Sequence, residues 1–263
     1  MGILNVTPDS FSDGGRHDVL EAAVTRARAM LDEGADIIDI GGESTRPGAA
    51  TVPVDEELRR TVPVVQALRE ATTDHDPAPL ISIDTRKPEV AEACVLAGAD
   101  IWNDVTALTY SERSLPLAAE LGCPVVLMHA QGTPDTMQDR PRYDDPVEEV
   151  LAFLRARLDA CEAAGVEREA ITIDPGIGFG KRLSDNLALL KATDRFAALA
   201  PVLIGTSRKS FIQTIDSSPV DKRLPGSLAS ALHALQGGAS VLRVHDVAET
   251  LQAVRVWKAI VDA

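Results

Sequence analysis

The stretch DEGADIIDIGGES (residues 32–44) has the pattern of a helix end, a glycine, a buried strand and a polar loop, in that order. A glycine directly after a helix supplies the left-handed cap that ends many helices. The apolar run after it is continuous rather than alternating, which is typical of a parallel strand covered on both faces. The same join recurs in LAGADIW (96–102), ELGCPVV (120–126) and QGGASVL (236–242). The pattern predicts repeated helix-to-strand units.

Short apolar runs of this kind recur along the whole chain, with helical patterns between them, clearest over 19–34 and 146–165. The expected strands lie within residues 1–7, 35–42, 80–85, 100–105, 124–129, 170–176, 201–207 and 239–246. Eight strands alternating with helices indicate a parallel sheet, and the count of eight favours a closed barrel. We therefore predict the α/β class and one (β/α)8 TIM barrel domain over residues 1–263, with its active site at the C-terminal face of the strands.

Composition narrows the class of protein further. Apolar residues make up 45% of the chain and aromatic residues only 3%, which predicts an aliphatic core. The formal charge of −14 disfavours nucleic acid as a partner. Three scattered cysteines without CxxC spacing argue against disulfides and zinc, and favour a cytoplasmic location. No apolar run approaches membrane-spanning length and no signal peptide pattern is present, so we expect no membrane partner.

Polar residues end the predicted strands, at the face where barrel enzymes place their active sites. A buried polar group without a partner costs about 1–3 kcal/mol, so these residues must pair with one another or contact a ligand. For Asp39, Asp104 and Glu43 both explanations stay open. Ligand contact is favoured for Asp84, Asn103 and Asp174, whose carboxylate and amide groups suit the edge of a flat heterocycle. Seven strand ends carry Asn5, Asp39, Asp84, Asn103, Asp104, His129, Asp174, Arg243 and His245, and the remaining end supplies Ser207, Arg208, Lys209 and Ser210.

Basic residues form a second set at the same face: Arg46, Arg208, Lys209, Arg243 and His245. Phosphate sites in these barrels often use the loops after strands seven and eight. Cations gathered there in an acidic protein predict an anion site. Salt bridges to Asp84 or Asp174 are the alternative explanation.

Eight sequence blocks, in order and over nearly the whole chain, resemble the dihydropteroate synthase family. They are MGILNVTPDSFSDGG (1–15), GADIIDIGGESTRPGA (34–49), ISIDTRKPEVA (81–91), GADIWNDV (98–105), MHAQGTPDTMQ (128–138), ITIDPGIGFGK (171–181), GTSRKSFI (205–212) and PGSLASALHALQGGASVLRVHD (225–246). The resemblance implies a homodimeric (β/α)8 barrel of folate biosynthesis. It would be a transferase that joins 6-hydroxymethyl-7,8-dihydropterin diphosphate to 4-aminobenzoate, releases pyrophosphate, and is competitively inhibited by sulfonamides.

The resemblance also implies roles for individual residues. Asp84, Asn103, Asp174 and Lys209 would bind the pterin ring, with Met128 and Phe179 beside it. Asn5, Arg243 and His245 would hold the diphosphate, with Mg²⁺ at Asn5. The aminobenzoate side would comprise Phe11, Thr45, Arg46, Pro47 and Ser210, and the catalytic set would be Lys209, Arg243, His245 and Asp174. Ala130 and Asp185 depart from the residues that the family often shows there, Met and His.

Two alternative functions share part of this pattern. One is a pterin-binding barrel that transfers a methyl group from a folate to a corrinoid, which would need no aminobenzoate pocket. The STRPG and SRKS blocks argue against it. The other is a catalytically silent paralogue that binds a pterin, against which the intact basic set argues.

Overall fold

The computed structural model describes residues 1–7, 16–44, 49–132 and 141–263, and these contain eight strands. The strands are β1 (Gly2–Asn5), β2 (Ile37–Gly41), β3 (Leu80–Asp84), β4 (Ile101–Asp104), β5 (Val125–Met128), β6 (Ile171–Asp174), β7 (Leu203–Ile204) and β8 (Val241–Leu242). Each strand lies within a range predicted from the sequence. All pairs are parallel, with β1 to β6 in chain order in one sheet and β7 paired with β8.

Two isolated bridges join these two sheets into a closed cylinder. Gly2 bridges to Val244 on one side, and Ile173 bridges to Val202 on the other. The predicted (β/α)8 barrel is therefore confirmed, although its last two strands have only two residues each.

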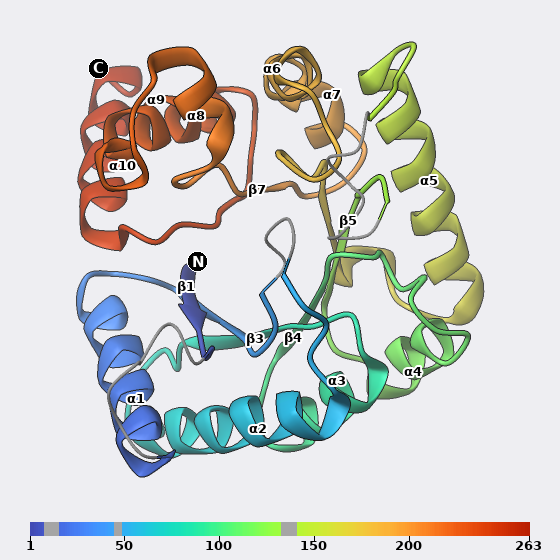
Figure 1. Cartoon of the computed structure of the whole chain (residues 1–263), viewed down its shortest axis with the longest axis vertical. Helices are drawn as coiled ribbons and strands as arrows, with labels where there is room; N and C mark the ends of the chain where they lie inside the picture. The colour runs from blue at the N-terminus through green and yellow to red at the C-terminus, as the bar shows by residue number, and fades with distance from the viewer. Residues whose placement is uncertain (8–15, 45–48, 133–140) are drawn as a thin grey trace.

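Helices surround the strands on the outside, α1 to α5 around one half of the ring and α6 to α10 around the other (Figure 1). The predicted helices over 19–34 and 146–165 are α1 and α5. The helices of the described residues are α1 (Arg16–Asp32), α2 (Val54–Ala71), α3 (Pro88–Leu96), α4 (Ser114–Leu121), α5 (Pro146–Ala164), α6 (Leu183–Lys191), α7 (Thr193–Ala197), α8 (Ser210–Asp216), α9 (Leu224–Gln236) and α10 (Val247–Val261). None of them is both long and apolar enough to span a bilayer.

Glycines end the helices before β2, β4, β5 and β8, as the sequence predicted. Gly34, Gly98, Gly122 and Gly238 have φ values of 101°, 114°, 62° and 93°, a region that side chains with a Cβ rarely adopt. These sharp reversals keep the helix-to-strand joins short and leave the longer loops at the opposite face.

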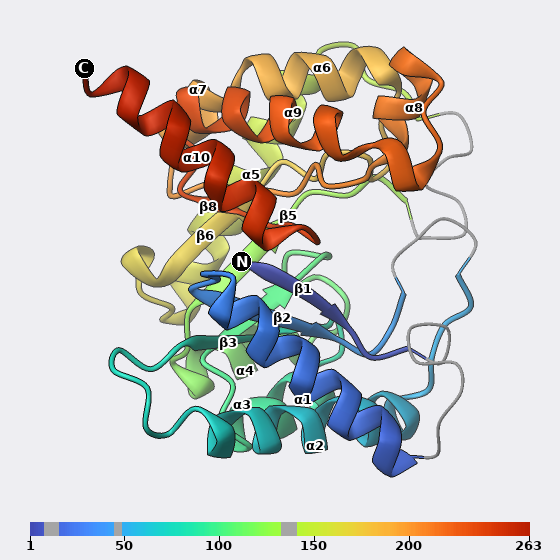
Figure 2. The same ribbon diagram turned by 90° about the vertical axis from the view of Figure 1, so that its left-hand side faces the viewer.

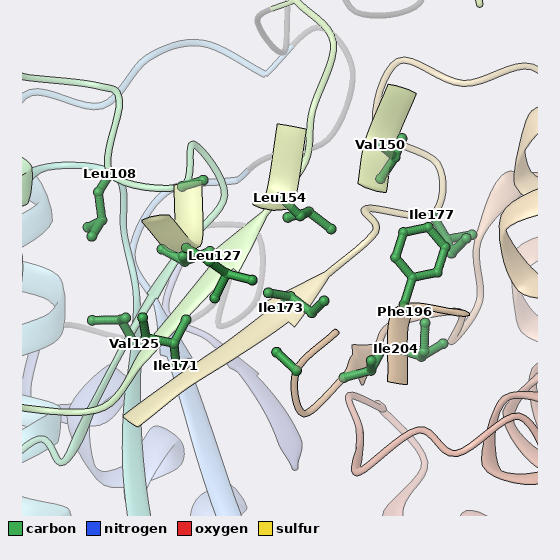
Figure 3. Close-up of a cluster of buried hydrophobic side chains, with 14 of the residues drawn as sticks. Leu108, Val125, Leu127, Val150, Leu154, Ile171, Ile173, Ile177, Phe196 and Ile204 are labelled. Carbon is green, nitrogen blue, oxygen red and sulfur yellow. The ribbon is translucent and has the colours of Figure 1, made fainter. Parts of the chain in front are cut away.

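Most of the hydrophobic core lies between the strands and the helices. Figure 3 shows Leu127 of β5, Ile173 of β6 and Leu154 of α5 gathered in one cluster, and all three are fully buried. A second cluster packs β1, β2 and β3 against α1 and α2. Both clusters take the outward-pointing residues of the strands.

The inward-pointing residues form a small apolar plug and then a polar layer. Ile101, Val126 and Leu203 pack together with Ile37 and Val241 in a separate cluster. Side chains two positions apart share one face of a strand, so the next inward-pointing residues are Asp39, Asn103, Met128 and Arg243. The strand period thus places the polar residues above the plug, toward the carboxyl ends of the strands.

Candidate active site

Arg243 lies at the centre of the polar layer and pairs with two carboxylates. Its Nε donates to Asp39 Oδ2 at 2.6 Å, and its Nη2 donates to Asp84 Oδ2 at 2.6 Å. Asn103 Nδ2 lies 3.3 Å from both oxygens of Asp39. The pairing explanation therefore applies to Asp39, which is completely buried. The predicted alternative of a salt bridge between a basic residue and Asp84 is also realised.

Asp84 keeps one carboxylate oxygen for another partner. Its Oδ1 is buried and accepts no hydrogen bond from the described residues. Burial raises the pKa of Asp84 to about 7, although the guanidinium of Arg243 acts to lower it. Burial acts to lower the pKa of Arg243, but Asp39 and Asp84 outweigh this effect and raise it. An orphaned carboxylate oxygen beside a fixed cation can accept an N–H from a ligand.

Asp174, at the end of β6, and Lys209, in the loop between β7 and α8, form the next part of the rim. Asp174 Oδ1 accepts a hydrogen bond from Gly176 N at 2.7 Å. Burial raises the pKa of Asp174, and the ammonium of Lys209 opposes the rise. Lys209 Nζ donates to the carbonyl of Ile177 and lies 4.8 Å from the centroid of the Phe179 ring. Burial lowers the pKa of Lys209 to about 8, against the attraction of Asp174.

Asn5, at the end of β1, and Asp84, at the end of β3, lie on either side of Gly41 in the sheet. The strand register aligns Asn5 with Gly41, and Gly41 with Asp84. A Cβ added to Gly41 would lie 3.8 Å from both Asn5 Oδ1 and Asp84 Oδ2, so these two oxygens flank the same point. Asn5 is therefore placed on the same rim as Arg243.

The two basic residues that flank this rim differ in their surroundings. His245 Nδ1 lies 3.0 Å from Ser207 Oγ, which also accepts a hydrogen bond from His245 N at 3.1 Å. Arg208 instead forms a salt bridge with Asp246 and its side chain is 43% exposed. The structure thus places Arg208 on the surface, apart from the anion site that the sequence pattern predicted for the basic set.

The structure brings together most of the predicted site residues that it describes. Met128 is buried and pairs in register with Asp174. Ser210 is exposed at the start of α8. The remaining predicted residues, Phe11, Thr45, Arg46 and Pro47, lie outside the described residues.

No cluster of metal ligands is preformed among the described residues, where no group of three or more His, Cys, Asp or Glu side chains could hold an ion. Mg²⁺ binds oxygen donors, keeps several waters, and is commonly held by one or two protein groups together with substrate phosphates. The amide oxygen of Asn5, next to a rim that carries Arg243, fits an ion of that kind.

Sequence reasoning missed a buried charge cluster under the loop that follows β2. Lys87 is 2% exposed, forms a salt bridge with the fully buried Glu57, and lies 3.1 Å from Glu43. A signal was present in α2, where Glu57 occupies the buried stripe that continues with Thr61 and Val64. A carboxylate on the apolar stripe of a helix indicates a buried cation opposite it.

Glu43 and Asp104 both follow the pairing explanation that the sequence left open. Glu43 also accepts a hydrogen bond from Val52 N at 2.7 Å. Asp104 accepts hydrogen bonds from Thr106 N at 2.7 Å and Leu108 N at 2.9 Å, which fix the turn after β4. Burial raises the pKa of Asp104 to about 6, and its hydrogen bonds oppose the rise.

Asp185, one of the two departures from the resembled family, has a structural partner. It accepts hydrogen bonds from the backbone N and Nε of Arg182, both at 2.9 Å, and so caps α6. Asp185 therefore stabilises a helix start and contacts none of the rim residues above.

Comparison with known proteins agrees with this geometry. The family model described as "Pterin binding enzyme" matches residues 1–245. The dihydropteroate synthase of Escherichia coli K12 is 49% identical over 264 aligned positions, which cover 100% of this chain and 92% of that protein.

Two solved structures are similarly close. Xanthomonas albilineans dihydropteroate synthase with 4-aminobenzoic acid is 50% identical, with a TM-score of 0.92, and the match covers 100% of this chain and 93% of that one. Yersinia pestis dihydropteroate synthase in a sulfonamide drug complex is 45% identical, with a TM-score of 0.92 and coverage of 100% and 94%.

The barrel, the rim of carboxylates and cations, and the family match define the class of protein: the chain is a pterin-binding enzyme. Within that class, identity over the full chain places it in the dihydropteroate synthase family. The sequence-based identification of the family is confirmed.

Proposed function

We propose that the chain condenses 6-hydroxymethyl-7,8-dihydropterin diphosphate with 4-aminobenzoate, giving 7,8-dihydropteroate and pyrophosphate in folate biosynthesis. The observation that carries the proposal is the buried Oδ1 of Asp84, which has no hydrogen-bond partner in the described parts of the chain, on a rim that also holds Arg243. An acceptor for a heterocycle edge and a cation for a diphosphate stand together there. Family membership supports the same transferase activity.

The pterin ring binds between the strand ends of β3, β4 and β6. Asp84 and Asp174 accept hydrogen bonds from the N–H groups of the ring edge, and Asn103 can donate or accept. Lys209 binds the ring on the β7 side. Met128 and Phe179 provide apolar contact, as their positions beside Asp174 and Lys209 support.

The diphosphate lies toward β1 and β8. Arg243 and His245 neutralise its charge, and Asn5 offers an amide oxygen to a Mg²⁺ ion that arrives with the substrate. When bound, the ion withdraws charge from the diphosphate and so makes it a better leaving group. Arg243 already sits between two carboxylates, which hold its guanidinium in one orientation.

The reaction breaks the bond between the exocyclic carbon of the pterin and the diphosphate oxygen. The pterin ring supports the positive charge that develops on that carbon, and the carboxylate of Asp174 stabilises it. The neutral amine of 4-aminobenzoate then forms the new C–N bond and releases one proton. Exclusion of water protects the cationic intermediate from hydrolysis.

The aminobenzoate side comprises Phe11, Thr45, Arg46, Pro47 and Ser210, by resemblance to the family. The printed titles of the Xanthomonas and Yersinia structures name 4-aminobenzoic acid and a sulfonamide drug as their ligands. By extension, sulfonamides compete with 4-aminobenzoate for this chain.

The enzyme works as a homodimer in the cytoplasm. An apolar groove lies between α9 and α10, where Val256 is 57% and Ile260 71% exposed. This groove supports a dimer in which a second copy of the chain packs against it. Figure 2 shows these two helices lying together on the outside of the barrel. All three cysteines are free, which agrees with a reducing compartment.

Release of pyrophosphate from the pterin diphosphate, measured with and without 4-aminobenzoate and Mg²⁺, tests the function. Release that requires 4-aminobenzoate is the expected result. Pterin binding without release would support the silent paralogue, and methyl transfer to a corrinoid would support the other alternative.

The variant Lys209→Ala tests the role assigned to Lys209. Lys209→Ala should lose turnover by about 100-fold or more, because the reaction loses a preorganised charge. Lys191→Ala, which removes an exposed lysine from α6, is the matched control and should keep wild-type turnover. Full activity of Lys209→Ala would remove that residue from the mechanism.

A further inference from the structure

Lys181 is a buried lysine that the proposed reaction does not use. It is 3% exposed and lies just past the glycine-rich loop that follows β6. Its Nζ donates to the carbonyls of His129 and Phe179, at 3.1 and 3.0 Å. A third contact joins it to His129 Nδ1 at 3.0 Å. Each of these three acceptors is neutral.

The protonation states suit this arrangement. Burial lowers the pKa of His129 to about 3, and the charge of Lys181 adds to the effect. The imidazole is therefore neutral at pH 7, and its Nδ1 can accept a hydrogen bond from the lysine. Burial also lowers the pKa of Lys181 to about 7, against the attraction of Asp174. Both the ammonium and the neutral amine can donate to the two carbonyls.

The loop that Lys181 contacts is rich in glycine, so its own sequence does little to restrict its backbone conformation. Gly176, Gly178 and Gly180 all have positive φ, of 70°, 87° and 63°. A Cβ on Gly176 would lie 1.9 Å from the carbonyl oxygen of His129, so the loop backbone packs directly on the backbone after β5. Side chains from outside the loop must therefore fix its shape.

Within the described residues, several polar side chains from outside this loop bind its backbone, and Asp174 is one of them through Gly176 N. Lys209 binds the carbonyl of Ile177, and Tyr143 Oη donates to the carbonyl of Gly180 at 3.0 Å. Asn186 Oδ1 accepts from Gly178 N at 2.6 Å. Lys181 is another, and its contacts join the loop to the end of β5.

We propose that Lys181 is a positioning residue of the pterin site, which holds Phe179 beneath the ammonium of Lys209 without touching the substrate. This inference rests on the proposed function. Lys181 anchors the carbonyl of Phe179 itself, and it anchors His129, the residue that follows Met128. Phe179 and Met128 are both assigned to the pterin ring. Loss of Lys181 should therefore weaken pterin binding more than it affects the other steps of the reaction.

Lys181→Met is the test, because methionine keeps the length and apolar stem of lysine and removes its donors. We expect the KM for the pterin diphosphate to rise about tenfold or more, since several hydrogen bonds that fix the site are lost. The KM for 4-aminobenzoate and kcat should change less than about threefold, because the loss weakens ground-state and transition-state binding equally. Lys191→Met on α6 is the matched control and should leave all three unchanged.

Amide hydrogen exchange in the free protein gives a second measurement that needs no turnover. The amides of Gly178 and Phe179, which bind Asn186 Oδ1 and the carbonyl of Gly176, should exchange about tenfold faster in Lys181→Met than in wild type. His129→Phe removes only one of the three contacts and should cause a smaller change in both measurements.

The outcomes separate this proposal from the proposed function. A wild-type protein that releases no pyrophosphate refutes the proposed function, while the exchange experiment still decides whether Lys181 fixes the loop. An active wild type combined with an unchanged pterin KM in Lys181→Met overturns the positioning role. A fall in kcat and both affinities together, with a lowered unfolding midpoint, also overturns it. If Lys181→Met does not fold, Lys181→Gln, which keeps a shorter donor, replaces it, and a smaller rise confined to the KM for the pterin diphosphate is expected.

Discussion

The buried lysine under the β2 loop supports a quantitative prediction about stability. Lys87 is 2% exposed and pairs with Glu57, which is fully buried, and with Glu43 at 3.1 Å. Lys87→Met leaves the buried Glu57 without its cation, whereas Glu43 keeps its ion pair with Arg86, and Glu57 Oε1 already has no hydrogen-bond partner among the described residues. Removing one partner of a buried ion pair costs about 3–5 kcal/mol.

Urea denaturation measures this loss directly, as a fall in midpoint with an unchanged m-value. For a chain of this size the loss corresponds to a fall in Tm of about 10 °C. Lys191→Met removes an exposed lysine from α6 and is the matched control, expected within about 0.5 kcal/mol of wild type. Adding Glu57→Gln to Lys87→Met should recover part of the loss, because it removes the carboxylate charge that Lys87→Met leaves uncompensated.

Two results would contradict this reasoning. One is a Lys87→Met protein within about 1 kcal/mol of wild type, since the cluster would then be solvated in solution. The other is strict additivity of Lys87→Met and Glu57→Gln, because residues in direct contact should show a coupling energy.

Three further predictions test the fold and the site. Gly122→Ala should lower the free energy of unfolding by about 1–2 kcal/mol, because its φ is 62° and the space around it is open. Gly176→Ala should lower it by about 1–3 kcal/mol more, because the added Cβ would meet the carbonyl of His129, and thermal unfolding compares the two variants. The kcat/KM for the pterin diphosphate should fall as pH rises through about 8, where Lys209 loses its proton, and Lys209→Arg should move that fall to higher pH in a pH–rate profile. Trp102→Phe leaves the carbonyl of Thr85 without its 2.7 Å hydrogen bond, and urea denaturation should show a loss of about 1–3 kcal/mol.

The strands were predictable because their pattern is local. Each is a short apolar run followed by a polar residue, and each glycine cap precedes its strand within a few residues. The rim residues followed from the same pattern, since the inward-pointing positions above the apolar plug carry Asp39, Asn103 and Arg243. The fold and much of the described site could therefore be derived before any coordinates.

The pairing of the charges could not be derived, because it depends on contacts between distant segments. Arg243 and Asp39 are 204 positions apart, and no spacing in the sequence connects them. Arg208 was grouped with the basic set from its neighbours along the chain, but its backbone has a φ of 58° and its side chain pairs with Asp246. Arg208 therefore lies at the surface, whereas the next residue, Lys209, contacts the loop after β6.

The closure of the barrel has a consequence for what holds its two sheets together. The cylinder consists of a six-stranded arc and a two-stranded wedge, and one bridged residue pair marks each seam between them. Asp39 and Asp84 belong to the arc and Arg243 follows the wedge. Their ion pairs therefore connect the two sheets across the seam between β8 and β1. Side chains that line the site therefore also help to close the cylinder, because the ion pairs of Arg243 join the two sheets beside the bridge between Gly2 and Val244.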